Sequence, residues 1–173
     1  MRTHSIVTGL LGPLLALGLV ASAQAGERIA LYQKQEVQLQ QQRLVGNVRA
    51  QARREGVVVN VPQLYVFLSD QSAAYHMDGY RSGFERELNL VVDRSRRARS
   101  MVRLDRLLER VLTADGERFS VDDLPPADVY IALYRRADCA TCDQVADALS
   151  AWSEGRPNLS VVWLDVSLDR PPR

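Results

Sequence analysis

The sequence predicts an α/β domain built on a layered, largely parallel sheet with flanking helices. Two observations lead to this prediction. After Gly56, apolar strand-like runs alternate with helix-like segments, and residues 129–167 contain the clearest strand–helix–strand succession. Strands that alternate with helices are typical of parallel sheets covered on their faces. A chain of 173 residues is also long enough for one domain with a core of its own.

Residues 1–25 have the features of an export signal. Arg2 lies near the start, the apolar run LLGPLLALGLV follows, and Ala23-Gln24-Ala25 matches a small-x-small cleavage site. We expect cleavage after Ala25 and a periplasmic protein with no integral membrane segment, because the apolar run is short for a bilayer span. The alternative is a retained N-terminal anchor.

The charge balance argues against nucleic acid or acidic lipid as the main partner. Arg2 is the only one of the 22 basic residues within the signal, so 21 remain beside 21 acidic residues. We therefore expect other envelope proteins as partners, and no nucleic acid. Six arginines do gather between Arg94 and Arg106, but interspersed acidic residues favour a solvated helix face over a phosphate site.

The segment that follows the signal, residues 26–56, is rich in glutamine and arginine and predicts an N-terminal helical extension. Its apolar residues fall at helical spacing, and Gly56 is a typical helix stop: Leu44, Val45, Val48, Ala52. The apolar stripe is thin, which leaves a solvated extension and a dimerisation arm as open alternatives. The α/β domain would then occupy residues 57–173.

Within that domain, the elements can be assigned in order from periodicity and turn residues. The expected sequence is a strand at Leu64–Leu68 after Pro62, a helix at Ser72–Leu88, a strand at Asn89–Asp93, a helix from Arg94 that ends near Gly116, a strand at Val129–Tyr134, a helix at Asp143–Trp152 and a strand at Ser160–Ser167. Trp152 and Trp163 are expected in the core beneath the last helix.

The only two cysteines, Cys139 and Cys142, lie between the expected strand Val129–Tyr134 and the expected helix Asp143–Trp152. At a helix start, unpaired N–H groups and the helix dipole stabilise a thiolate and lower its pKa. The spacing lets the second sulfur reach the first, so the pair can cycle between dithiol and disulfide through a mixed disulfide. Arg135 and Arg136 would favour the thiolate, whereas Asp138 and Asp143 would oppose it.

The succession VYIALYRR, CATC, an amphipathic helix and LSVVWLDVS resembles the thioredoxin-like superfamily over Val129–Ser167. The resemblance implies a thioredoxin-like sheet and a thiol–disulfide exchange site, with Cys139 as the attacking and Cys142 as the resolving thiol. The chain departs from the family in three respects. Ala137-Asp138 replaces the common aromatic residue, Ala-Thr is an unusual intervening pair, and no proline loop, hairpin and helix follow Ser167.

Two explanations of the last departure remain open. Residues 63–128 would supply the rest of the sheet in a rearranged order, with Pro62 or Pro125/Pro126 as the proline beside the cysteines. Alternatively, the chain is a relative that keeps the fold unit without the activity. Exported components of conjugative DNA-transfer machinery look similar, and FSVDDLPPADVYIAL resembles them faintly.

The cysteine pair itself has three interpretations. A zinc site needs about four ligands, and after the signal the chain offers only His76 besides the cysteines, so we expect no metal and no other cofactor. A structural disulfide at the helix start and a redox-active pair both suit an exported protein. The sequence thus predicts either thiol–disulfide exchange on envelope proteins or a non-catalytic periplasmic assembly or interaction protein, and leaves open whether it is an enzyme.

Overall fold

A six-stranded mixed sheet with helices on both of its faces forms the fold. The computed structural model describes residues 26–43, 51, 55, 60–94 and 102–169. Its strands are β1 Glu27–Gln33, β2 Gln63–Leu68, β3 Ala73–Asp78, β4 Val111–Leu112, β5 Val129–Arg135 and β6 Val161–Ser167. Its helices are α1 Gln35–Arg43, α3 Phe84–Asp93, α4 Leu104–Leu108, α5 Ala140–Glu154 and the short 3-10 helix η1 Val121–Asp123. The predicted α/β class is therefore confirmed.

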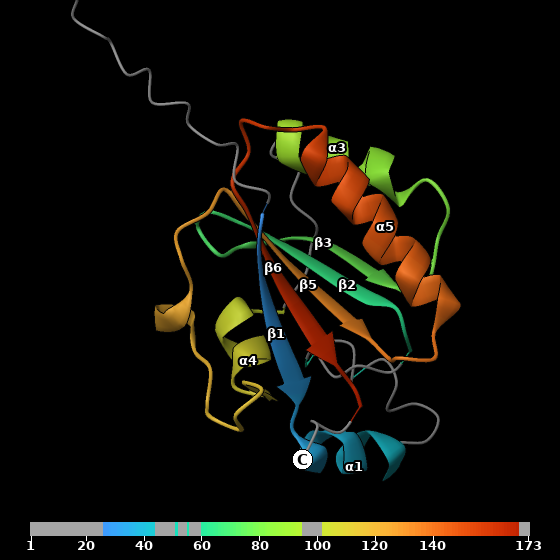
Figure 1. Ribbon diagram of the computed structural model, residues 1–173, viewed down its shortest axis with the longest axis vertical. Coiled ribbons are helices and arrows are strands. Elements are labelled where there is room, and N and C mark those ends of the chain that lie inside the picture. The colour runs from blue at the N-terminus through green and yellow to red at the C-terminus, as the bar shows by residue number, and fades with distance from the viewer. Residues whose placement is uncertain (1–25, 44–50, 52–54, 56–59, 95–101, 170–173) are drawn as a thin grey trace, which may run out of the picture.

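The strand order is β3-β2-β5-β6-β1-β4, which places β5 and β6 at the centre (Figure 1). β1, β6 and β5 run parallel, whereas β2, β3 and β4 each pair antiparallel with a neighbour. The prediction of a largely parallel sheet is wrong on this point. Only four residues, 69–72, join β2 to β3, and a connection that short produces an antiparallel pair.

Two hydrophobic cores lie on opposite faces of the sheet. α3 and α5 cover one face, where their apolar stripes pack on β2, β3, β5 and β6. α4 covers the other face. Central strands buried on both sides read as continuous apolar runs, which is why β2 and β5 were predictable from the sequence. Trp152 and Trp163 are 9 % and 4 % exposed within the core beneath α5, as predicted.

The region between β2 and α3 differs from its prediction. Residues 73–78 form an edge strand, and the helix starts only at Phe84, after two glycines with positive φ, Gly79 and Gly83. The expected strand at Asn89–Asp93 is the last part of α3, because Leu88 and Val91 are buried at helical spacing. Pairing with β2 outweighs the weak helical pattern of residues 73–78.

The N-terminal segment also differs from its prediction, because it opens with a strand of the central sheet. β1 pairs in parallel with β6 from Glu27 opposite Val162 to Tyr32 opposite Ser167. Alternation explains this, since Leu31 faces the α4 core while neighbouring side chains face out. α1 then begins at Gln35, and the apolar residues that suggested a helix, Leu44, Val45, Val48 and Ala52, lie outside the described residues.

The helix expected from Arg94 onward is present only in part. Residues 95–101 lie outside the described part of the chain, α4 covers Leu104–Leu108, and Val111 and Leu112 form β4 instead of continuing the helix. Two of the clustered arginines, Arg103 and Arg106, are exposed and pair with neighbouring carboxylates at 2.7 and 2.9 Å. In the described residues, no helix is long and apolar enough to cross a membrane.

Candidate functional site

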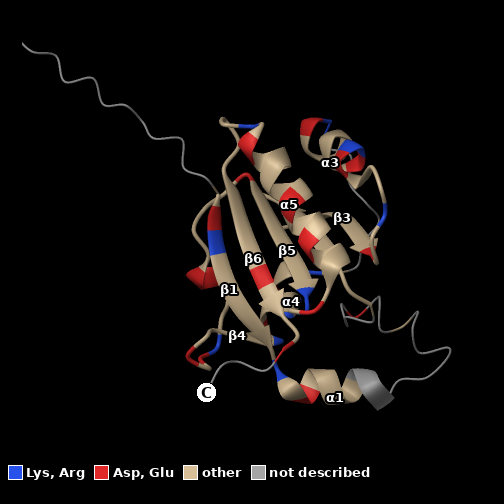
Figure 2. Cartoon of the chain, turned by 45° about the vertical axis from the view of Figure 1, so that its right-hand side comes forward, with Lys and Arg blue, Asp and Glu red and all other residues tan. Residues whose placement is uncertain are grey.

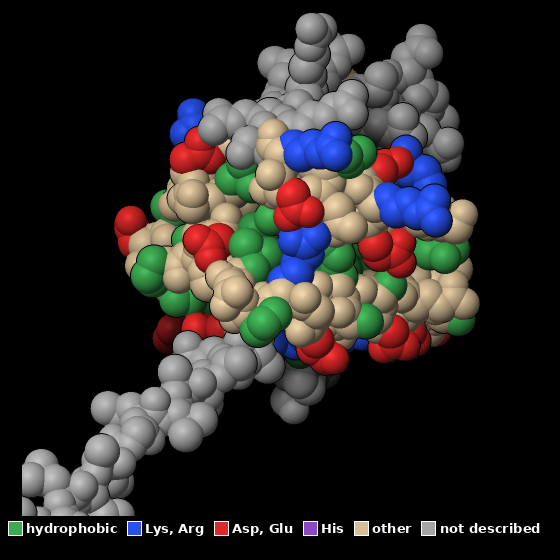
Figure 3. Space-filling model, turned by 90° about the horizontal axis from the view of Figure 1, so that it is seen from above, with side chains coloured by type: hydrophobic (Ala, Val, Ile, Leu, Met, Phe, Trp, Pro, Cys, Tyr) green, Lys and Arg blue, Asp and Glu red, His purple; other side chains and the backbone are tan. Residues whose placement is uncertain are grey.

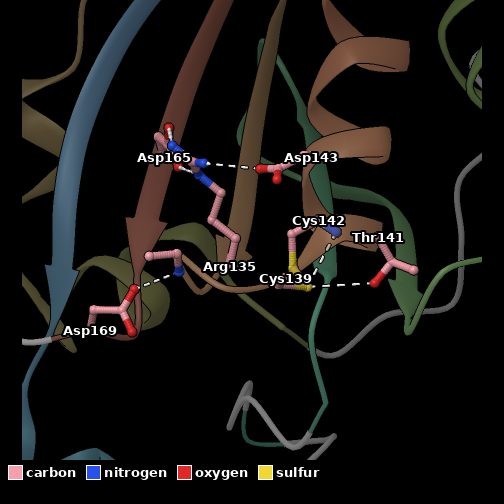
Figure 4. The surroundings of a disulfide bond; sticks show 8 residues. Arg135, Cys139, Thr141, Cys142, Asp143, Asp165 and Asp169 are labelled. Atoms are coloured by element: carbon pink, nitrogen blue, oxygen red, sulfur yellow. Dashed lines mark hydrogen bonds and ion pairs between the residues drawn. A yellow bond between two sulfur atoms is a disulfide. The ribbon is translucent and has the colours of Figure 1, made fainter.

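Cys139 and Cys142 form a disulfide at the junction of β5 and α5, with their Cα atoms 5.2 Å apart (Figure 4). β5 ends at Arg135, a short loop follows, and Cys139 is the N-cap residue of α5. The pair therefore lies beyond the carboxyl ends of the parallel strands β5 and β6. This edge of an open α/β sheet is where ligand and reaction sites usually lie.

The two sulfur-bearing residues differ in exposure. Cys142 is 0 % exposed and begins the buried stripe of α5, which continues with Val145 and Leu149. Cys139 is only partly buried, at the surface of the loop. Cys139 is therefore the more accessible of the two residues for an incoming thiolate, and Cys142 is left as the thiol that departs or attacks from inside.

The start of α5 supplies hydrogen bonds to the outer sulfur. The backbone N–H of Cys142 donates to Sγ of Cys139 at 3.2 Å, and Thr141 Oγ1 lies 3.5 Å from the same atom. In the reduced protein the same donors would face a thiolate at the end of a 15-residue helix. Both the donors and the helix dipole lower the pKa of a thiol in this position.

Of the two cations expected beside the cysteines, Arg136 is exposed and Arg135 is already paired. The Arg135 guanidinium donates to both carboxylate oxygens of Asp165, at 2.6 and 2.8 Å, and its Nη1 lies 3.7 Å from Asp143 (Figure 4). Asp138 is exposed just before Cys139. The carboxylates around the disulfide therefore offset the effect of the arginine on the thiolate.

The residues that follow β6 hold the cysteine loop in place. Asp169 accepts a hydrogen bond from the backbone N–H of Ala137 at 2.7 Å, and the N–H of Leu168 donates to the carbonyl of Arg135 at 2.9 Å. Asp165 and Asp169 were not predicted from the sequence as residues of the site. One signal was present, because parallel strands joined by a helix end at the same edge, which brings the end of β6 beside the end of β5.

Of the candidate prolines, Pro62 lies at the cysteine end of the sheet. Gln63 pairs with Tyr134 at the end of β5, so the preceding Pro62, whose peptide bond with Val61 is cis, lies next to the loop that carries Cys139. Pro125 and Pro126 precede the start of β5, at the opposite end of that strand.

His76 lies on the edge strand β3, where its ring stacks on Tyr65 with the centroids 4.5 Å apart. Burial raises the pKa of the Tyr65 hydroxyl far above its usual range. The described part of the chain contains no group of three or more His, Cys, Asp or Glu side chains arranged to hold a metal ion.

The site thus consists of one partly exposed sulfur, one buried sulfur, a helix start that donates to the outer sulfur, and a paired arginine beneath it. Such an arrangement can form a mixed disulfide with an external thiol and resolve it. No protein-family model, no curated protein and no solved structure matches this chain.

Proposed function

We propose that this protein is an exported, atypical thioredoxin-like protein that exchanges thiols and disulfides with envelope proteins through Cys139 and Cys142. The unequal exposure of the two sulfurs at the start of α5 is the observation that carries the proposal. A structural disulfide has no need of one accessible sulfur, whereas exchange requires it. The pairing of the two cysteines also suits an oxidising compartment such as the periplasm.

The proposed reaction moves two electrons between two cysteine pairs. In the oxidising direction, a substrate thiolate attacks Sγ of Cys139, the Cys139–Cys142 bond breaks, and Cys142 leaves as a thiolate. The second thiolate of the substrate then attacks the substrate sulfur of the mixed disulfide. This step forms the disulfide of the oxidised substrate and releases Cys139 as a thiolate. The reducing direction is the reverse, with Cys142 attacking Cys139 to release the substrate.

The arrangement of the sheet supports the thioredoxin-like part of the proposal. β5, α5 and β6 supply the strand–helix–strand unit with the cysteines at its first turn. The antiparallel strand β2 pairs with β5, β3 pairs with β2, and α3 contacts β3 and α5, although all three precede β5 in the sequence. These are the elements that usually follow the cysteine unit in the superfamily, and here they precede it in the chain.

A second function has one observation in its favour. The carboxylates of Asp165 and Asp143 compensate Arg135, which removes a cation that would otherwise activate the thiolate. This suits a non-catalytic periplasmic assembly or interaction protein, such as a component of a conjugative transfer or secretion system, whose disulfide only fixes the start of α5.

A redox titration against glutathione separates the two functions. Exchange activity predicts a potential above about −300 mV, the level below which structural disulfides lie. It also predicts that Cys142→Ser traps an envelope protein as a mixed disulfide on Cys139, while Cys139→Ser traps none. A potential below this level, together with no trapped partner, would identify a structural bridge. In that case the variant with both cysteines changed to alanine should keep its biological role.

A further inference from the structure

A pocket of about 460 Å³ lies at the end of α5 that is remote from the disulfide. Its lining comes from the start of β1, the last turns of α5, the loop that follows α5 and the start of β6, and it includes Arg28, Ser150, Glu154, Leu159 and Trp163. The cysteines belong to the first turn of α5, so this pocket is separate from the proposed exchange site. Its volume is typical of sites that enclose a small ligand.

Arg28 gives this pocket an uncompensated positive charge. Its guanidinium lies over the Trp163 ring, 4.8 Å from the ring centroid, and forms no ion pair within the described part of the chain. The other guanidinium of the lining, that of Arg156, bonds to both carboxylate oxygens of Asp93 at 2.6 and 3.0 Å. Figure 2 shows the basic position of Arg28 near the start of β1. Arg28 is thus positioned by the indole and still able to bind an anion.

Two neutral hydrogen-bond donors accompany Arg28. The Trp163 side chain is 4 % exposed, yet its indole N–H has no hydrogen-bond partner in the described residues, whereas the Trp152 N–H donates to Asn89. Ser150 Oγ accepts from Arg28 at 3.5 Å, and its own hydroxyl donates to no described residue. Buried indole N–H groups usually have an acceptor. A ligand with acceptor oxygens would supply the one that Trp163 lacks.

The close approach of Gly26 to β6 leaves the N–H edge of this indole uncovered. A Cβ atom on Gly26 would lie 2.6 Å from the Val161 carbonyl oxygen and 3.4 Å from Cδ1 of Trp163, the ring carbon bonded to Nε1. Position 26 therefore has no room for a side chain, and the polar edge of the indole faces a residue that itself lines the pocket.

The rest of the lining selects the body of a ligand and its charge. Pro157, Leu159 and Val161 provide apolar surface, and Figure 3, which views this end of the molecule, shows hydrophobic side chains among basic and acidic ones. Glu154 is the one carboxylate among the lining residues that the structure describes, and it is exposed. Its charge opposes a second negative group on a ligand bound to Arg28.

We propose that this pocket binds an apolar monocarboxylate, whose oxygens accept from Arg28, Ser150 and the Trp163 N–H. The planar guanidinium matches the two oxygens of a carboxylate, and the apolar body packs on Leu159 and Pro157. Two sources share this chemistry, a free apolar acid and the C-terminal carboxylate of an apolar peptide. This binding function goes beyond the proposed exchange and does not depend on it.

The test is an NMR titration of the two indole N–H signals with 4-phenylbutyrate, its uncharged analogue 4-phenylbutanamide, and acetate. The Trp163 signal, assigned by its absence in Trp163→Phe, should shift with 4-phenylbutyrate, while the Trp152 signal should move less because its N–H is already bonded to Asn89. The acid should bind about tenfold more tightly than the amide, because a hydrogen-bonded charge pair is lost. Acetate should bind more weakly, because it lacks the apolar body.

Three variants locate the carboxylate within the pocket. Arg28→Gln should reduce the affinity for 4-phenylbutyrate to that of the amide, and Glu154→Gln should increase it about twofold at low ionic strength. Arg118→Gln removes the same charge as Arg28→Gln from an exposed residue outside the pocket, and it should leave the affinity unchanged. The peptide acetyl-Ala-Ala-Leu, with a free or an amidated C-terminus, represents the second source, and tighter binding of its free form than of 4-phenylbutyrate would identify a peptide end as the ligand.

Three results would overturn the site. These are no shift of the Trp163 signal with either acid, equal affinities for 4-phenylbutyrate and its amide, or an unchanged affinity in Arg28→Gln. Each of them would leave the exchange function of Cys139 and Cys142 intact, because the redox potential and the trapping of a mixed disulfide are measured independently of this pocket.

Discussion

Arg135 and Asp165 form a two-point ion pair at the carboxyl ends of β5 and β6, with N–O distances of 2.6 and 2.8 Å. The two residues come from neighbouring parallel strands, and the first turn of α5 lies above them (Figure 4). The pair keeps a guanidinium near the disulfide and compensates its charge at the same time. We therefore expect the reactivity of Cys139 to depend on Asp165 as well as on the start of α5.

The variant Asp165→Asn should lower the pKa of the Cys139 thiol in the reduced protein. In water, repulsion from a nearby carboxylate destabilises a thiolate by about 0.5 kcal/mol. Removal of the Asp165 charge should therefore raise the thiolate fraction near neutral pH about twofold. The measurement is the rate of iodoacetamide alkylation as a function of pH, with Asp115→Asn as the control at a distant exposed site. A thiol pKa that rises in Asp165→Asn would contradict this account of the ion pair.

Reduction of the disulfide should destabilise the fold moderately. The bond closes a loop of only four residues, from Cys139 to Cys142, and in the chain-entropy model such a loop contributes about 2 kcal/mol. Urea unfolding of the oxidised and the reduced protein measures this difference. The double variant Cys139→Ala/Cys142→Ala should unfold at the same urea concentration with and without reductant. An unchanged wild-type midpoint after reduction would show that the bond adds no stability.

Trp152→Phe should cost more stability than Trp163→Phe. Both variants lose the same indole-to-phenyl volume from buried sites, but only the Trp152 indole donates a hydrogen bond, to Asn89 at 2.8 Å. This bond joins α5 to α3, and its loss should add about 1 kcal/mol to the difference between the two variants. Denaturant unfolding of both variants gives the comparison. A larger loss of unfolding free energy in Trp163→Phe would contradict this expectation and would show that the indole on β6 contributes more stability.

Ser160→Ala should raise the pKa of Asp128 toward its ordinary value of about 3.9. The Ser160 hydroxyl and backbone N–H both donate to this carboxylate and lower its pKa, and the variant removes the hydroxyl. Because the folded-state pKa is lowered, the stability from this contact is present above pH 4 and is lost as the pH falls through the lowered pKa. Carboxyl NMR titration tests this, with Asp93, held by Arg156, as an internal reference.

The central part of the fold could be predicted because its local and tertiary signals agree. β5 and β2 are buried on both faces and appear as apolar runs, and α5 has a clear apolar stripe. β3 could not be predicted, because its strand character comes from pairing with β2 and not from its own pattern. Val91 and Val92 favour a strand by propensity, yet Val91 packs from a helix.

The candidate site was predictable only along the chain. The spacing and position of Cys139 and Cys142 indicated a disulfide at a helix start, and the disulfide is present. The neutralised state of Arg135 was not predictable, because it depends on which residue of β6 lies beside it across the sheet. The place of Pro62 similarly depends on the antiparallel register of β2 and β5, which no local pattern encodes.

The central position of β5 and β6 has a consequence for the order in which the molecule can assemble. β2 with β3, and β1 with β4, are two strand pairs that touch only through β5 and β6, the last two strands of the chain. Glu27 of β1 can pair with Val162 of β6 only after the last strand has been made. A chain emerging from its N-terminus therefore lacks the two central strands of its sheet until residues 129–167 are present. Long-range closure of this kind slows folding. The cysteines lie in this same segment, between β5 and β6. Their short loop can therefore close before either strand pair has docked on these two strands.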